Sequence, residues 1–156
     1  MPLDASRARE VFLSDAVSLK PLAAFRIGLA AVLLYQAMLL GEYRQLLLYE
    51  GGPVSWALGE SLIDPLIPTF SRLLAGAAPL GITSEGLVLI VFGAHVAAVS
   101  ALLVGFQTRS AALVAWITHV VIVNSTRLFT YGVGSMLTIG LFYCVFMPVS
   151  RELIAL

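Results

Sequence analysis

The chain has 156 residues, of which 60% are hydrophobic and 12% charged, and its mean hydropathy is +0.97. About a quarter of the residues in a soluble domain are charged, so this composition excludes an ordinary soluble protein. Nine basic side chains balance nine acidic ones, which excludes nucleic acid and acidic substrates as partners. The length predicts one domain, residues 1–156, and the single cysteine, Cys144, can form no intrachain disulfide.

The first 20 residues are mixed and polar. They lack the apolar run and the small-residue cleavage site of a signal peptide, so we expect them to be retained. Asp4 or Ser6 can cap a short helix that continues to about Val17. Because this segment has one apolar and one charged face, we predict an interfacial helix lying on the membrane.

Four later segments are candidates for membrane crossing, which takes roughly 20 apolar residues at 1.5 Å each. We predict spans at about residues 21–41, 85–105, 110–128 and 133–149. The third and fourth are short and are expected to lean on their neighbours. The predicted fold is an all-α integral membrane protein, a four-transmembrane-helix bundle.

The connection between the first two spans, residues 42–84, contains several prolines and charged side chains. A full crossing would have to bury each charge at about 2.5–3.5 kcal/mol, so this segment is not expected to span. Its apolar runs, Ser55–Leu62 and Leu66–Leu74, predict short helices at the interface, anchored by Trp56 and Phe70. We therefore expect an external amphipathic insertion.

The distribution of basic residues predicts the orientation, because the cytoplasmic flanks of spans are enriched in Lys and Arg. Five basic residues fall on one side of the four predicted spans and three on the other. This favours a multi-pass protein of the bacterial inner (cytoplasmic) membrane with both termini in the cytoplasm. The larger set is Arg7, Arg9, Lys20, Arg109 and Arg151; the smaller set is Arg44, Arg72 and Arg127.

Two arginines are candidate lipid-binding or structural charges. Arg26 lies about one and a half turns into the first span, where its stem could snorkel to headgroups or pair with a lipid phosphate. The alternative for Arg26 is a functional buried cation. Arg127 lies at the outer end of the third span and could pair with Glu50, Asp64 or Glu85 to hold the insertion on the bundle, or could bind an anionic headgroup.

The two histidines, His95 and His119, lie about twelve residues on either side of a turn between Gln107 and Thr108. In antiparallel helices both would lie at one depth, roughly 18 Å from the turn, where polar side chains usually face protein. Three roles stay open: interhelical hydrogen bonding, a quinone or lipid site, and axial ligation of haem b. Small residues around His95 favour close helix packing over a haem-sized gap, and two histidines are too few for zinc. The hydrogen-bonding candidates are the two rings themselves, Ser100, Thr118 and Tyr143.

Small residues and aromatic residues within the spans predict packing. Glycines and alanines let helix backbones approach closely inside a membrane bundle. Bulky aromatic residues of the third and fourth spans are expected to face lipid or a partner. The glycines concerned are Gly28, Gly93, Gly132, Gly134 and Gly140, and the aromatic residues are Trp116, Phe142, Tyr143 and Phe146.

Several short pieces occur in a characteristic order. They are Phe25-Arg26 in the first span, Glu50 to Pro53 after it, Gly105 with Thr108-Arg109, Asn124 to Arg127, and Pro148. Together they resemble the horizontally transferred transmembrane family, which is similar to the membrane part of vitamin K-dependent γ-glutamyl carboxylase. The resemblance covers nearly the whole chain but only the amino-terminal half of a typical member. It implies a short form or a partner that supplies the rest.

The carboxylase relies on a lysine base just after the third span. The corresponding stretch here reads NSTRLFTYGVGSM, and the only lysine in the chain is Lys20. Arginine does not deprotonate in proteins and cannot replace that base. The acid that members often carry after the glycine at the start of the fourth span is also absent, since Ser135 follows Gly134.

These departures favour a noncatalytic membrane subunit or scaffold over an enzyme. Such a subunit would bind lipids and dock through its helix faces to a respiratory or photosynthetic type of complex, or to an identical copy. The alternative is a redox or lipid-modifying membrane protein that uses His95, His119 and Arg127 around a quinone-like ligand. No covalently bound cofactor is expected.

Overall fold

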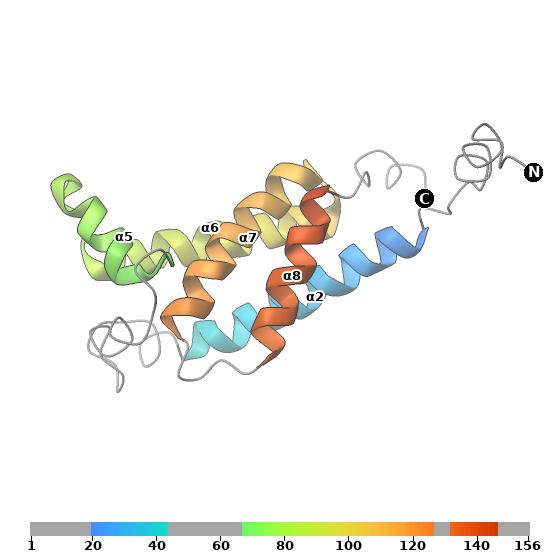
Figure 1. The fold of residues 1–156 in the computed structure, drawn as a ribbon, viewed down its shortest axis with the longest axis horizontal. Coiled ribbons are helices and arrows are strands. Elements are labelled where there is room, and N and C mark those ends of the chain that lie inside the picture. The colour runs from blue at the N-terminus through green and yellow to red at the C-terminus, as the bar shows by residue number, and fades with distance from the viewer. Residues whose placement is uncertain (1–19, 44–66, 127–131, 147–156) are drawn as a thin grey trace, which may run out of the picture.

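The computed structural model describes residues 20–43, 67–126 and 132–146, and every regular element among them is helical (Figure 1). The predicted all-α fold is therefore confirmed for these residues. The elements are α2 (Lys20–Glu42), α5 (Phe70–Ala77), the 3-10 turn η1 (Ala78–Leu80), α6 (Ser84–Val104), α7 (Thr108–Ser125) and α8 (Gly132–Phe146).

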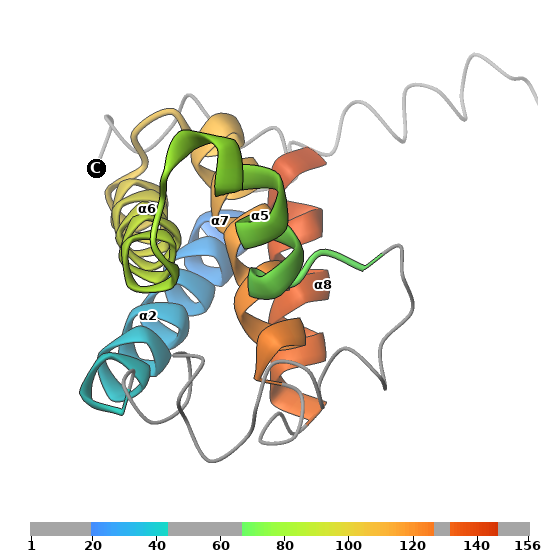
Figure 2. The ribbon, with the colours of Figure 1, turned by 90° about the vertical axis from the view of Figure 1, so that its left-hand side faces the viewer.

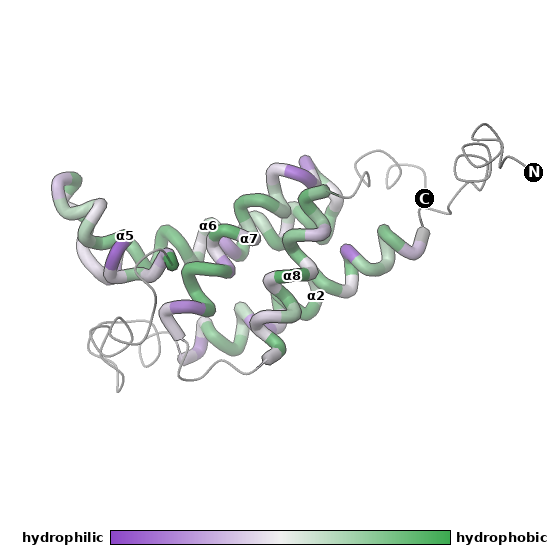
Figure 3. The backbone as a smooth tube through the Cα atoms, in the orientation of Figure 1, coloured by the Kyte–Doolittle hydropathy of each residue, from purple (hydrophilic) through white to green (hydrophobic). Residues whose placement is uncertain are grey.

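Two helices, α2 from Pro21 onward and α6, are long and apolar enough to cross a membrane, and α8 is apolar but shorter. Figure 3 shows the long helices as hydrophobic over most of their length. The helices begin and end within a few residues of the predicted spans. The predicted interfacial helix at the N-terminus, the predicted helix Ser55–Leu62 with Trp56, and Arg127 lie outside the described residues.

Four helices form a bundle. The antiparallel pair α6 and α7 packs together, α8 packs on α7, and α2 packs mainly on α6 with a smaller contact to α8. Figure 2 shows α2 and α6 on one side, α8 on the other and α7 between them. Each helix thus contacts its neighbours in chain order, and α2 and α8 close the ring.

The turn between α6 and α7 spans only three residues. Gly105 ends α6 with a left-handed φ of 87°, and both its N–H and that of Phe106 donate to the Ala101 carbonyl. This is a usual helix C-terminus, where glycine adopts that φ without a Cβ clash. Gln107, with φ 41°, is the one non-glycine residue with a positive φ among the described residues.

The last turn of α7 carries a run of polar side chains that bond back onto the helix. The side chains of Asn124, Ser125 and Thr126 each donate to the carbonyl four residues earlier, at 2.8–2.9 Å. These carbonyls also accept backbone N–H groups, as the Ile122 carbonyl does from the Thr126 N–H, so the side chains add second hydrogen bonds to the last turn of the helix. The polar run that begins at Asn124 lies within the predicted third span, and in the structure it forms the C-terminal end of α7.

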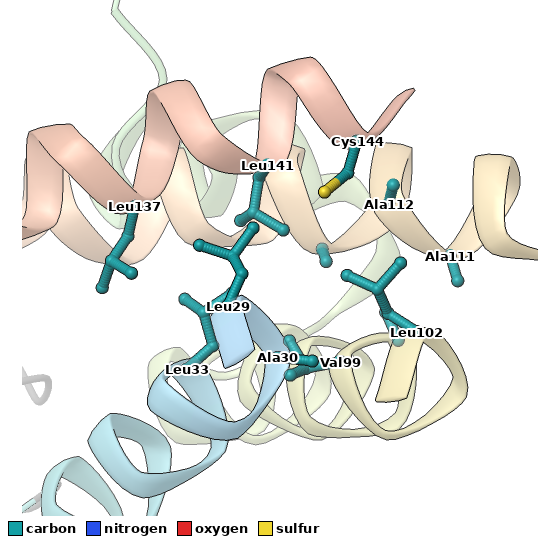
Figure 4. Packing of buried hydrophobic residues seen from close by; sticks show 12 residues of the cluster. Leu29, Ala30, Leu33, Val99, Leu102, Ala111, Ala112, Leu137, Leu141 and Cys144 are labelled. Atoms are coloured by element: carbon teal, nitrogen blue, oxygen red, sulfur yellow. The ribbon is translucent and has the colours of Figure 1, made fainter. Parts of the chain in front are cut away.

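The core of the bundle draws small and branched aliphatic side chains from all four helices (Figure 4). Helix α7 contributes only alanines to this cluster, which lets α6 and α8 approach its backbone. Leu29 and Leu33 of α2 point toward Leu137 and Leu141 of α8 in Figure 4. The cluster comprises Leu29, Ala30, Leu33, Ala98, Val99, Leu102, Ala111, Ala112, Ala115, Leu137, Leu141 and Cys144.

The glycines of the spans were predicted to pack inside the bundle, but only some of them do. Gly140 does, because a Cβ there would lie 2.9 Å from Leu29 Cδ1, and Gly134 is buried. At Gly28, Gly93 and Gly132 a Cβ would meet no atom within 4 Å. For these three, the prediction of packing within the bundle is wrong, because helices that are apolar all round carry no signal of which face turns inward.

A short helix, α5, covers one end of the bundle beyond α6 and α7 (Figure 1). Phe70 is 0% exposed and packs with residues of α6 and α7, and its N–H donates to Ser125 Oγ at 2.9 Å. A short helix at about Leu66–Leu74 was predicted, but it begins at Phe70, and Phe70 anchors it to protein rather than to the membrane interface.

Candidate functional site

The two histidines meet inside the bundle. The ring centroids of His95 on α6 and His119 on α7 lie 5.5 Å apart, and the ring planes are inclined by only 22°. Their side chains are 3% and 2% exposed. The prediction that both lie at one depth on neighbouring helices is therefore confirmed, and it follows from the short turn that fixes the register of the hairpin.

Each ring has a polar partner within the bundle. His95 Nδ1 lies 3.0 Å from Thr118 Oγ1, whose own proton is donated to the Val114 and Ala115 carbonyls at 2.8 and 3.1 Å. A hydroxyl has one proton, so Thr118 accepts here and we assign the proton of His95 to Nδ1. His119 Nε2 lies 3.4 Å from the Gly134 carbonyl, which can only accept. The N–H of each neutral ring is thus directed to α7 or α8.

This geometry disfavours haem ligation by the pair. The nitrogen lone pairs of imidazole lie in the ring plane, whereas His95 and His119 face each other with nearly parallel planes. A single iron between the two faces would meet π-clouds rather than lone pairs. At 5.5 Å between centroids, the rings also leave no gap for a macrocycle between them.

The geometry also disfavours a quinone carbonyl as ligand. Such a carbonyl needs a donor, and the N–H groups of both neutral rings are already directed to partners in the bundle. What the pair does chemically is to join α6, α7 and α8 by polar contacts at one depth. Thr118 was among the predicted partners, whereas Tyr143 is 58% exposed and points away from the core.

Arg26 lies inside the bundle and not at its surface. Its side chain is 2% exposed, and Nε, Nη1 and Nη2 have no hydrogen-bond partner among the described residues. It lies near enough to Cys144 of α8 to interact with it electrostatically. The side chain is thus packed inside the bundle, and the expectation that it snorkels to headgroups or pairs with a lipid phosphate stays a prediction.

Two further residues at this end were missed as candidates. Thr108, the first residue of α7, is 2% exposed, and its Oγ1 has no hydrogen-bond partner among the described residues. Cys144 was considered only for disulfides, and its thiol is free and buried. The available signal was positional, since Arg26, Thr108 and Cys144 all lie near the predicted cytoplasmic ends of their spans.

Arg127, Glu50 and Asp64 lie outside the described residues, and Glu85 is exposed in the first turn of α6. Within the described ranges no three His, Cys, Asp or Glu side chains come together as metal ligands would.

No protein-family model and no curated protein matches the sequence, and no solved structure matches the fold.

Proposed function

We propose that the chain is a noncatalytic subunit of a membrane assembly, with four membrane-spanning helices, that docks through its helix faces to other membrane proteins or to a second copy. The observation that carries this proposal is that polar side chains lie inside the bundle and large apolar side chains cover its outside, the reverse of a soluble protein. Arg26, His95 and His119 lie inside the bundle. Large apolar side chains such as Met38 and Met136, which are 70% and 74% exposed, cover its outside.

This distribution suits lipid better than water as the solvent. In a soluble domain, arginine is almost never fully buried without a partner, and large exposed apolar areas are rare. In a bilayer, polar side chains face protein and apolar ones face the acyl chains. All four long helices present such outward apolar residues: Val32 and Tyr35, Leu89 and Ile90, Val114 and Ile117, and Ile139 and Phe146.

The lengths of α7 and α8 are compatible with shorter crossings. The 18 residues of α7 extend about 27 Å and the 15 of α8 about 22 Å, against about 30 Å of hydrocarbon. A short span is accommodated by local thinning or by association with neighbouring helices. The contacts of α7 with both α6 and α8 supply such neighbours.

Outward small residues support docking. Gly28 on α2 and Gly93 on α6 are exposed, and neither has an atom within 4 Å of where a Cβ would lie. Small residues on a lipid-facing surface allow another helix to approach closely. Kinship with the horizontally transferred transmembrane family, without the lysine base of the related carboxylase, is part of the same proposal and agrees with a role that involves no chemistry.

Cysteine labelling tests the four crossings. In a Cys144→Ser background, we expect Tyr43→Cys and Gly132→Cys to react with a membrane-impermeant maleimide from the same side, and Phe106→Cys only from the other. All three positions are exposed. If α2 and α6 alone cross the membrane, Gly132→Cys instead labels together with Phe106→Cys, and the four-span topology is wrong.

Purification in mild detergent tests the function. We expect a colourless protein that co-purifies with other membrane proteins or with itself and contains no stoichiometric quinone. The double variant His95→Leu/His119→Leu should keep the same spectrum and lose about 0.6–1.7 kcal/mol of stability per interhelical hydrogen bond. A Soret band or one extracted quinone per chain would refute the noncatalytic role. An unchanged stability in the double variant would refute the structural role of the histidine pair.

A further inference from the structure

The histidine pair connects α8 to the α6–α7 hairpin through its neutral form. The rings of His95 and His119 lie 5.5 Å apart between centroids, and their side chains are 3% and 2% exposed. His119 Nε2 lies 3.4 Å from the Gly134 carbonyl of α8, and His95 Nδ1 lies 3.0 Å from Thr118 Oγ1. A neutral imidazole has one N–H, so each ring directs its single proton to one acceptor.

A second proton on either ring has no acceptor in this arrangement. A protonated imidazole carries an N–H on both nitrogens, and neither ring makes a further hydrogen bond among the described residues. The Ala115 carbonyl lies near His95 but already accepts the Thr118 hydroxyl. The two rings cannot share the proton, because their planes are nearly parallel and the nitrogen lone pairs lie in those planes. The added charge would therefore be buried and unpaired, which is strongly unfavourable.

No carboxylate among the described residues faces the pair. Gly134 is in the first turn of α8, and the positive N-terminal end of that helix disfavours a cation beside it. Arg26 and Cys144 interact with each other toward the opposite end of α8, since ten residues from Gly134 to Cys144 extend about 15 Å along a helix. On α5, Arg72 donates to the Ile67 carbonyl. The exposed ionisable side chains of the surrounding helices are Tyr35, Glu42, Glu85, Arg109 and Tyr143.

We propose that His95 and His119 form an acid-sensitive contact, which holds α8 against the α6–α7 hairpin while both rings are neutral and releases it when they are protonated. The helix that separates is α8, because a three-residue turn joins α6 to α7 and α8 is the shortest of the four long helices. The pair lies beside the first turn of α8, so separation at this end admits water to both rings. This inference does not depend on the proposed docking role.

The direction of the pH effect follows from the protons that each state binds. Histidine in water binds its proton near pH 6.5, whereas the packed rings lack an acceptor for a second N–H. The released state therefore binds more protons, so the contact is intact at pH 7.5 and weakens as the pH falls below 6.5. For two rings, the released fraction should rise about a hundredfold between pH 7.5 and pH 5.5.

The reactivity of Cys144 measures the release, because this thiol on α8 is buried and is the only cysteine of the chain. In mild detergent, its rate of reaction with 4,4′-dithiodipyridine is divided by that of a short cysteine peptide at the same pH. Between pH 7.5 and 5.5 this ratio should rise about a hundredfold in wild type and about tenfold in His95→Gln or His119→Gln, which each keep one titrating ring. The double variant should show no rise. A constant ratio in wild type, or an equal rise in the double variant, overturns the proposal.

Val88→Cys in a Cys144→Ser background is the matched control. Val88 is 0% exposed and belongs to a cluster with Phe70 and Val121 that contains no residue of α8. Its thiol should stay unreactive at pH 5.5 when α8 alone separates. A rise as large as that of Cys144 would show that acid unfolds the whole bundle, which refutes the release of α8.

The wild-type profile decides the question if the glutamine variants do not fold. The chain has no histidine besides these two, and histidine is the side chain that ordinarily changes charge between pH 5 and 8. Two histidines require the Cys144 ratio to increase with about the square of the proton concentration below pH 6. A rise that begins only near pH 4, where carboxylates bind protons, overturns the proposal.

Discussion

Phe70→Ala is expected to detach α5 from the end of the bundle. Phe70 is fully buried between α6 and α7 among Leu87, Val88, Val121 and Ile122. Truncating such a side chain removes its burial and leaves a cavity, at a cost of about 3–5 kcal/mol. Because α5 has only eight residues and cannot be stable alone, we expect amide hydrogen exchange throughout Phe70–Ala77 to accelerate, while exchange in the middle of α6 and α7 stays slow.

Leu73→Ala is the matched control for this change. Leu73 is on the same helix but 37% exposed, so its truncation should cost far less and leave α5 protected. A second control, Ser125→Ala, keeps the Phe70 side chain and removes the hydrogen bonds of Ser125 Oγ with the Phe70 N–H and the Val121 carbonyl, at about 1 kcal/mol each. If Phe70→Ala exchanges no faster than Leu73→Ala, α5 is held by something other than this side chain.

Gly140→Val is expected to separate α2 from α8. A Cβ at Gly140 would lie 2.9 Å from Leu29 Cδ1 and 3.3 Å from Leu29 Cδ2, and valine adds two further methyl groups. Overpacking a filled core typically costs about 1–3 kcal/mol. Gly140→Ala should cost less, since the end of the Leu29 side chain can shift. Unfolding of the purified protein in detergent micelles measures both.

The control and the rescue both involve α2. Gly28→Val makes the same substitution next to Leu29, but in open space, and should leave the stability of the bundle nearly unchanged. Leu29→Ala makes room, so the pair Gly140→Val and Leu29→Ala should be less destabilising than the sum of the single changes. Additive costs would show that the two residues do not touch.

The sequence predicts the helices of this chain better than their rotation. Lys20 and Glu42 bound one apolar run and Thr83 and Gly105 another, so the ends of α2 and α6 lie within one residue of the predicted spans. The depth of His95 relative to His119 was predictable for a similar reason, because a short turn fixes the register of an antiparallel pair.

The faces of the helices could not be predicted in the same way. A helix that is apolar on all sides carries no amphipathic stripe, so nothing in the sequence distinguishes Gly28, which faces outward, from Gly140, which faces α2. For Arg26 the sequence leaves two roles open, a place at the headgroups, to which long basic side chains usually return, and a buried cation. Its inward direction depends on which face of α2 meets α8, which is set by packing across the bundle and not by local sequence.

The three-residue turn between α6 and α7 also sets which side chains can form a pair deep in the bundle. Each residue of a helix turns by about 100° and rises 1.5 Å. One residue inserted within α7 between Thr108 and His119 would thus move His119 to another face of the helix while hardly changing its depth. The number of helical residues between the turn and His119 is consequently what sets the partner of the His95 ring.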